Sequence, residues 1–238
     1  MKNLLELALE AHGGLTRWSH LKAVTADLSV TGALWQIKGQ TGALQQIRIE
    51  AELRRQKLTT HFRGQDKRTT FTANSVTLET EGGRLLQSRA NPRSSFAGQV
   101  LNSPWDELHV AYFSSYALWT YLTVPFLYTF SGFETEELSA WHEDGEIWRP
   151  LRVSFPNGIA SHSREQISYF GPDGLLRRHE YGVDVLGGAP GLNYAHEFRE
   201  VDGILVPVKR RVYSFDTDKH KVPDPVLVAI DIHEIAFS

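Results

Sequence analysis

Three histidines are the first side chains in this sequence that could do chemistry together. His162, His179 and His196 fall on three consecutive strands that the pattern predicts. Three imidazoles on one face of a sheet could hold a zinc ion with an open fourth position. A two-residue turn at Gly187-Gly188 places His179 opposite His196, whereas a turn centred on Pro172-Asp173 places His162 opposite about Val183 rather than His179. The sequence therefore predicts a histidine pair at most, and no metal site is assigned.

The same strands carry carboxylates at Glu165, Glu180 and Glu197, with arginines close by. Paired carboxylates transfer protons when burial separates their pKa values, but opposite charges on neighbouring strands are more typical of cross-strand pairs on a solvent face. The chain has no cysteine and no Gly-x-Ser-x-Gly turn. The glycine-rich stretch 187–191 lacks the spacing and the lysine of a phosphate-binding loop. No catalytic residue and no cofactor is predicted.

An aromatic segment between residues 105 and 122 is the main candidate for a binding surface. Its side chains lie at helical spacing, and two readings of them stay open. In the first, they line a ligand pocket in which a tyrosine hydroxyl or an imidazole orients a polar head group. In the second, the helix fills the interior with its own side chains, which its aromatic character on nearly all sides favours. For the first reading, the candidate lining residues are Trp105, His109, Tyr112, Phe113, Tyr116, Trp119, His179, Tyr181 and His196.

The ends of this helix are marked by capping residues and prolines. Ser103 suits the N-cap, Pro104 the first helical position, and Asp106 the place of a capping carboxylate. Pro125 ends the helix or bends it. We therefore predict a helical insertion over residues 103–130.

Strand patterns flank this insertion on both sides. Val24, Ala26, Leu28 and Val30 alternate with polar residues, which predicts a strand with one dry and one wet face. The same alternation recurs later in the chain, and glycine-containing turns separate the runs. We predict a single domain, 1–238, with N-terminal helices over 1–21, a first β-meander over 22–90 and a second β-meander over 136–238.

A long antiparallel sheet of this kind must hide its dry face. Aromatic helices at the start and in the middle of the chain favour a partly curled sheet with a helix packed into its open end. We predict a mainly β (α+β) fold: a single curved antiparallel sheet that forms an open or half β-barrel, with N-terminal helices and a mid-chain helical insertion as plug or lid. An incompletely filled interior would make an apolar cavity that suits lipids and similar molecules.

Two short segments carry a resemblance to a known superfamily. Residues 200–207, Glu-Val-Asp-Gly-Ile-Leu-Val-Pro, resemble the Gly-hydrophobic-x-x-Pro hairpin of half-barrel lipoprotein carriers, and residues 169–175, Tyr-Phe-Gly-Pro-Asp-Gly-Leu, resemble the turn two strands before it. The order of elements is similar to that superfamily (LolA-like, LolB-like and mycobacterial LppX-like proteins) over most of the chain. The resemblance implies an open β-barrel with a helical lid over a hydrophobic groove. It carries over no functional residue and no particular cargo.

Composition and charge limit the kinds of partner that the protein is expected to have. The 238 residues are 41% hydrophobic with a net charge of −3, which predicts a substantial core and argues against a nucleic-acid partner. The longest apolar stretch, 117–130, is too short to span a bilayer and contains Pro125, so no transmembrane segment is predicted. Glu6 and Glu10 interrupt the apolar N-terminal residues. This pattern argues against a signal peptide and predicts a cytoplasmic protein.

These observations favour a soluble binding protein for a hydrophobic or amphipathic, lipid-like small molecule held inside a lidded half-barrel. Two alternatives stay open. One is an enzyme on the same scaffold that uses His109, His179 or His196 with a nearby carboxylate as acid and base. The other is a partner-binding module that uses the free edge strands of an open sheet. The oligomeric state stays open as well.

Overall fold

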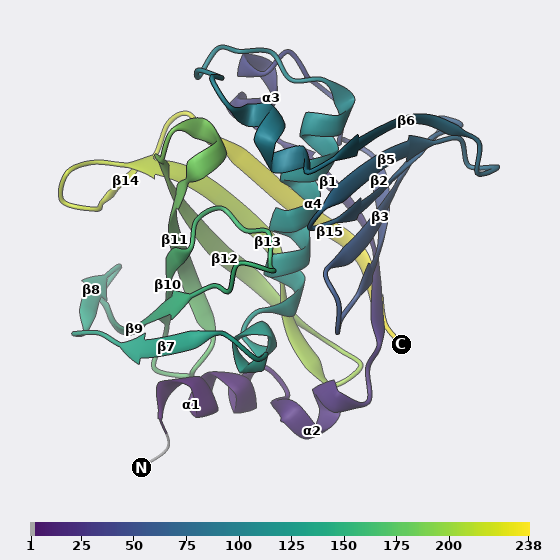
Figure 1. The fold of residues 1–238 in the computed structure, drawn as a ribbon. Helices are drawn as coiled ribbons and strands as arrows, with labels where there is room; N and C mark the ends of the chain where they lie inside the picture. The colour runs from purple at the N-terminus through teal and green to yellow at the C-terminus, as the bar shows by residue number, and fades with distance from the viewer. Residues whose placement is uncertain (1–2) are drawn as a thin grey trace.

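A computed structural model describes residues 3–238, and Figure 1 shows a curved antiparallel sheet wrapped around one long helix, α4. Helices α1 and α2 lie at one end of the sheet, and α3 lies at the other end. The helical elements are α1 (Leu4–Ala11), α2 (Gly14–Ser19), α3 (Ala33–Ile37), α4 (Glu107–Thr123) and the 3-10 turns η1 (Pro92–Phe96), η2 (Phe126–Thr129) and η3 (Asp184–Leu186).

The strands belong to one antiparallel sheet. Their bounds are β1 (Ala23–Thr31), β2 (Ile47–Glu52), β3 (Lys57–Phe62), β4 (Arg68–Thr72), β5 (Ser75–Glu79), β6 (Leu85–Ala90), β7 (Glu134–Glu137), β8 (Trp141–Glu143), β9 (Glu146–Ser154), β10 (Glu165–Phe170), β11 (Leu176–Val183), β12 (Ala189–Val201), β13 (Ile204–Phe215), β14 (Lys221–Val222) and β15 (Val228–Phe237). Their main order is β6-β5-β4-β3-β2-β1-β15-β13-β12-β11-β10-β9-β7, with β8 paired to β9 and β14 paired to β13.

The first and last strands join the two meanders. β1 pairs with β15 in antiparallel register, while β6 and β7 form the two ends of the strand order in residues 3–238. The sheet is therefore curved and open, and the predicted fold class is confirmed. The predicted alternation is also confirmed, because Val24, Ala26, Leu28 and Val30 of β1 are buried and the residues between them are half-exposed.

Helix α4 occupies the concave side of the sheet, as Figure 1 shows. Every α4 residue after Glu107 is buried, so the helix forms much of the core itself. On one face, Nε1 of Trp119 donates a hydrogen bond of 2.7 Å to the carbonyl of Glu52 at the end of β2. The helix ends at Thr123, two residues before Pro125, as the proline predicts.

The predicted start of α4 was wrong. Its N-cap is Asp106, whose side chain accepts a hydrogen bond of 2.8 Å from the backbone N–H of His109. The Ser103 hydroxyl instead accepts from the N–H of Val100, at 2.9 Å. The N–H of Trp105 donates to a carbonyl in the segment that follows α3. That contact between distant segments holds the backbone outside the helix until Asp106.

Helix α3 has no counterpart among the elements predicted from the sequence. Its five residues are too few to display a helical period. Leu34 and Trp35 are nevertheless buried, and they cover one end of the interior. Within residues 3–238, none of the helices has the length and apolar character needed to cross a lipid bilayer.

Candidate functional site

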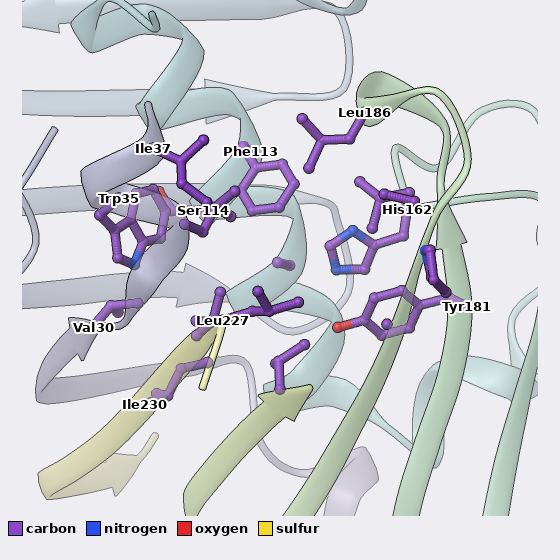
Figure 2. A pocket seen from close by; sticks show the side chains of 18 of the residues that line it. Val30, Trp35, Ile37, Phe113, Ser114, His162, Tyr181, Leu186, Leu227 and Ile230 are labelled. Atoms are coloured by element: carbon purple, nitrogen blue, oxygen red, sulfur yellow. The ribbon is translucent and has the colours of Figure 1, made fainter. Parts of the chain in front are cut away.

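A cavity of about 100 Å³ lies inside the curved sheet, between α4, α3 and strands of the second meander (Figure 2). Phe113 and Ala117 line it from α4, and Trp35 lines it from α3. Ile230 of β15 lines it near Val30, and Tyr181 of β11 lies across the cavity from Trp35 (Figure 2). Leu101 also lines the cavity and is 58% exposed, so the cavity reaches the molecular surface there.

The cavity is apolar because its few polar side chains already have partners in the protein. The Ser114 hydroxyl donates to the carbonyl of Val110 at 2.8 Å, and Nε1 of Trp35 donates to the carbonyl of Thr31 at 3.2 Å. Ser114 and Ala117 are small residues one turn apart on a helix that is otherwise rich in large rings. The space remains open beside these two small side chains.

A buried chain of hydrogen bonds forms one side of the cavity. Nδ1 of His162 lies 3.1 Å from the Tyr116 hydroxyl, and Nε2 lies 2.8 Å from the Tyr121 hydroxyl. The Tyr121 hydroxyl lies 2.7 Å from that of Tyr181, and the His162 ring stacks on the Tyr181 ring with centroids 4.0 Å apart. Burial lowers the pKa of His162 well below 6.5. The imidazole is therefore neutral at physiological pH.

Arg210 holds the C-terminal end of α4 from the facing strand β13. Its Nη2 donates to the carbonyl of Tyr121 at 3.0 Å, and its guanidinium lies 4.9 Å from the centroid of the Tyr121 ring. The last turn of α4 has no basic residue of its own. Arg210 supplies the cation that a helix C-terminus favours. Burial lowers the pKa of Arg210 to about 10, which keeps it charged at neutral pH.

A second, much smaller void lies beside Arg210. Its volume is about 10 Å³, and it shares Leu118, Tyr121 and Ile230 with the larger cavity. That volume is close to the minimum for one water molecule. His179 is also in the range of the Arg210 charge: burial, together with that charge, lowers the pKa of His179 to about 3. We therefore assign this inner region to the packing around α4 rather than to ligand binding.

The candidate residues predicted from the sequence separate into two groups. Phe113 and Tyr181 line the cavity, and Tyr116 joins it through the His162 hydrogen bond. His179 is fully buried beside them, and the centroid of its ring lies 5.3 Å from that of the Tyr181 ring. Neither ring nitrogen of His179 has a hydrogen-bond partner within residues 3–238.

Five other candidates lie away from the cavity, of which four are in the interior and the fifth, His196, is exposed. Trp105, His109 and Tyr112 pack around Phe96 of η1, with ring centroids 5.5, 4.7 and 5.8 Å from it. The ring of His109 belongs to the capping box at the start of α4. Trp119 points to the β2 side of the helix, where its N–H is bonded to a strand carbonyl. These side chains fill the interior, in line with the second reading of the aromatic segment.

The predicted register of the histidine strands was wrong. His179 pairs with Asn193, and His196 pairs with Lys209. The turn η3 lies between β11 and β12, so pairing begins at Val183 and Ala189 rather than beside a two-residue turn. The resulting three-residue shift is odd, and an odd shift moves a side chain to the other face of the sheet. His196 is therefore exposed on the outer face.

The three histidines consequently do not converge. His162 lies in the loop before β10 rather than on a strand, and its carbonyl accepts from the N–H of Asp184 at 3.0 Å. Residues 3–238 contain no cluster of three or more side chains placed to hold a metal ion.

Sequence reasoning missed Tyr121, His162 and the α3 residues Leu34 and Trp35 as cavity residues. A signal for Tyr121 was present, because it lies eight residues after Phe113 and therefore on the same face of the helix. His162 and α3 had no such signal, since their positions depend on loops.

The fold and cavity define a class of protein: an open antiparallel sheet curved around a helix, with a small apolar chamber beside it. Two solved structures are similar to it. One is a LolA superfamily protein from Nitrosomonas europaea, with a TM-score of 0.55 and 10% identity over 99% of this chain and 92% of that one. The other is a domain named for outer membrane lipoprotein sorting from Vibrio parahaemolyticus, with a TM-score of 0.54 and 11% identity over 99% of this chain and 94% of that one.

These likenesses show that the chain has the LolA-like fold, as the hairpin and turn segments suggested. No family model matches the sequence, and no curated protein matches it either.

Proposed function

We propose that this protein binds a hydrophobic or amphipathic, lipid-like small molecule in the cavity beside α4. The observation that carries the proposal is the cavity itself, whose walls are apolar and which reaches the surface near Leu101. Pockets for small molecules combine an apolar lining with a few placed polar groups. The chain of Tyr116, His162, Tyr121 and Tyr181 is such a group.

The size of the cavity limits the ligand. A cavity of about 100 Å³ is smaller than an engineered apolar cavity of about 150 Å³ that binds benzene. The space suits an apolar group smaller than a benzene ring, such as a short segment of an acyl chain. A longer ligand would have to extend out past Leu101, which is exposed at the opening.

The similarity to the LolA superfamily protein supports the same class of ligand through its fold. The Vibrio parahaemolyticus domain is named for lipoprotein sorting, and lipoproteins carry acyl chains. Identities of 10% and 11% transfer no residue. The proposal therefore names an apolar group and not a lipoprotein.

Native mass spectrometry of gently purified protein and displacement of a fluorescent fatty-acid probe test this proposal. We expect co-purified apolar molecules or saturable probe uptake with one site per chain. Leu85→Ser is the matched control, because Leu85 is exposed on the edge strand β6 and is not among the residues that line the cavity. If that variant loses the probe, the probe binds at the exposed edge strand and not in the cavity; if wild-type protein takes up nothing, the proposal is wrong.

A second candidate function has one specific observation in its favour. The edge strand β6 exposes Leu85 and Leu86 next to its unpaired side. Exposed apolar edge strands are templates for pairing with another chain. Size-exclusion chromatography with light scattering tests this, since Leu85→Lys with Leu86→Lys should abolish any self-association.

Residence in the cytoplasm stays a prediction, to be tested by cell fractionation.

A further inference from the structure

The loop between η1 and α4 exposes two large apolar side chains where the cavity reaches the surface. Val100 is 68% exposed and Leu101 is 58% exposed. Single exposed apolar residues are ordinary on a protein surface. These two are neighbours in the chain, and Leu101 also lines the cavity. We call Val100 and Leu101 the apolar tip.

The backbone of the apolar tip is held by a buried lysine. Lys38 follows α3 and has no exposed surface. Its ammonium donates to the carbonyls of Val100, Leu101 and Ser103 at 3.2, 2.7 and 3.4 Å. A lysine ammonium has three donor hydrogens, so this one loop uses all of them. A loop that is already fixed loses little conformational entropy when its side chains bind another surface.

The surface around the opening is almost free of charge. Four segments that contribute to the cavity lining are 33–47, 94–105, 185–191 and 225–230. Lys38 is the single charged residue in these segments, although 22% of the whole chain is charged. Because Lys38 is buried, the four segments present no formal charge to the solvent.

We propose that this end of the molecule docks on the surface of a neutral phospholipid bilayer, with the apolar tip inserted among the acyl chains. Apolar side chains bind at the boundary between head groups and acyl chains, and the affinity grows with the apolar area that is buried. An uncharged surface suits zwitterionic head groups, and the net charge of −3 disfavours anionic lipids.

Docking in this orientation brings the cavity against the membrane. Leu101 belongs to the apolar tip and lines the cavity, so a bilayer that takes up the tip also meets the opening. The inference goes beyond the proposed function, because docking needs no ligand in the cavity.

Flotation of wild-type protein with phosphatidylcholine vesicles tests the docking. We expect Val100→Ser with Leu101→Ser to weaken vesicle binding roughly tenfold or more, since two side chains lose their apolar burial. Raising the salt concentration from about 0.1 to about 0.5 M should leave binding of wild-type protein unchanged, because no charges attract the protein to these lipids.

Ile147→Ser is the matched control. Ile147 is 54% exposed, does not line the cavity and lies next to Glu146 in the β8–β9 hairpin. Figure 1 shows this hairpin well away from α3. The control should change vesicle binding less than twofold. If it weakens binding as much as the double variant does, binding is not specific to the apolar tip and the inference is wrong.

A fluorescent label tests the orientation directly. The sequence has no cysteine, so one introduced cysteine carries the label at one place. An environment-sensitive fluorophore on Val100→Cys should brighten and shift to shorter wavelength when phosphatidylcholine vesicles are added, whereas the same label on Ile147→Cys should not respond. Equal responses at the two positions would overturn the inference.

The remaining outcomes separate the inference from the proposed function. Wild-type protein that takes up the fatty-acid probe but does not float with phosphatidylcholine vesicles, or floats only with anionic vesicles, refutes the docking and leaves the proposed function intact. Protein that floats with phosphatidylcholine vesicles but takes up no probe in their absence refutes the proposed function and supports the docking.

Discussion

Replacing Ala117 by leucine tests the cavity through two measurements that should move in opposite directions. Ala117 is buried in α4 and lines the cavity. Leucine adds three carbon atoms at the place where the helix leaves space. We expect the affinity for an apolar probe to fall and the free energy of unfolding to rise.

The size of the stability gain follows from the volume. At roughly 24 cal/mol per Å³, a cavity of about 100 Å³ corresponds to about 2.4 kcal/mol. Burial of three carbons at about 0.8 kcal/mol each gives the same upper bound. The cavity is open near Leu101, and leucine fills only part of it. We therefore expect Ala117→Leu to add about 1 kcal/mol and to raise Tm by about 2–4 °C.

Ala111→Leu is the matched control on the same helix. Ala111 is 2% exposed but does not line the cavity. The same three carbons should overpack the core there and cost about 1–3 kcal/mol, while probe affinity per folded molecule stays unchanged. Urea denaturation and probe titration measure both quantities. If Ala117→Leu destabilises as much as Ala111→Leu and keeps the probe, the ligand does not bind beside Ala117.

Three other changes have expected outcomes. Tyr128→Phe removes the buried hydrogen bond of 2.6 Å between the hydroxyls of Tyr128 and Ser168. It should lower the free energy of unfolding by about 1–2 kcal/mol. Adding Ser168→Ala should restore much of that loss, as a double-mutant cycle by urea denaturation would show. Acid should destabilise the protein, because burial lowers the pKa of His12 to about 4 and of His179 to about 3, whereas both take up a proton near pH 6.5 once unfolded. Stability is thus present above pH 6.5 and falls as pH decreases toward 4, with about 2 kcal/mol lost per histidine by pH 5; urea titrations across pH should show a shallower decline for His12→Asn. Arg93→Met breaks an ion pair of 2.6 Å that ties η1 to η3. Since η3 contributes to the cavity wall, stopped-flow release of the probe should be faster by roughly two- to fivefold.

Much of the fold could be predicted because it depends on patterns between residues that are close together in the sequence. The alternation from Val24 to Val30 depends only on which face of one strand is dry, and the end of α4 near Pro125 depends only on the backbone of one residue pair. Neither feature depends on where the rest of the chain lies in space. The fold class follows from them, since strands with one dry face and one long apolar helix have few ways to bury both.

The site was less predictable because it depends on how distant segments meet. The position of His196 is set by the number of residues in the turn before β12, where η3 changes the register by an odd number. Loop paths, which carry no period, bring His162 to Tyr121. The start of α4 at Asp106 likewise depends on the hydrogen bond that Trp105 makes to the segment after α3.

Helix α4 fills the concave side of the sheet and also leaves a gap there. A helix selected only to fill the concave face would carry large side chains on every side, because interiors pack to a nearly constant density. α4 instead carries the small residues Ser114 and Ala117 where it lines the cavity. That gap forgoes stability, and proteins keep such losses mainly where function needs them.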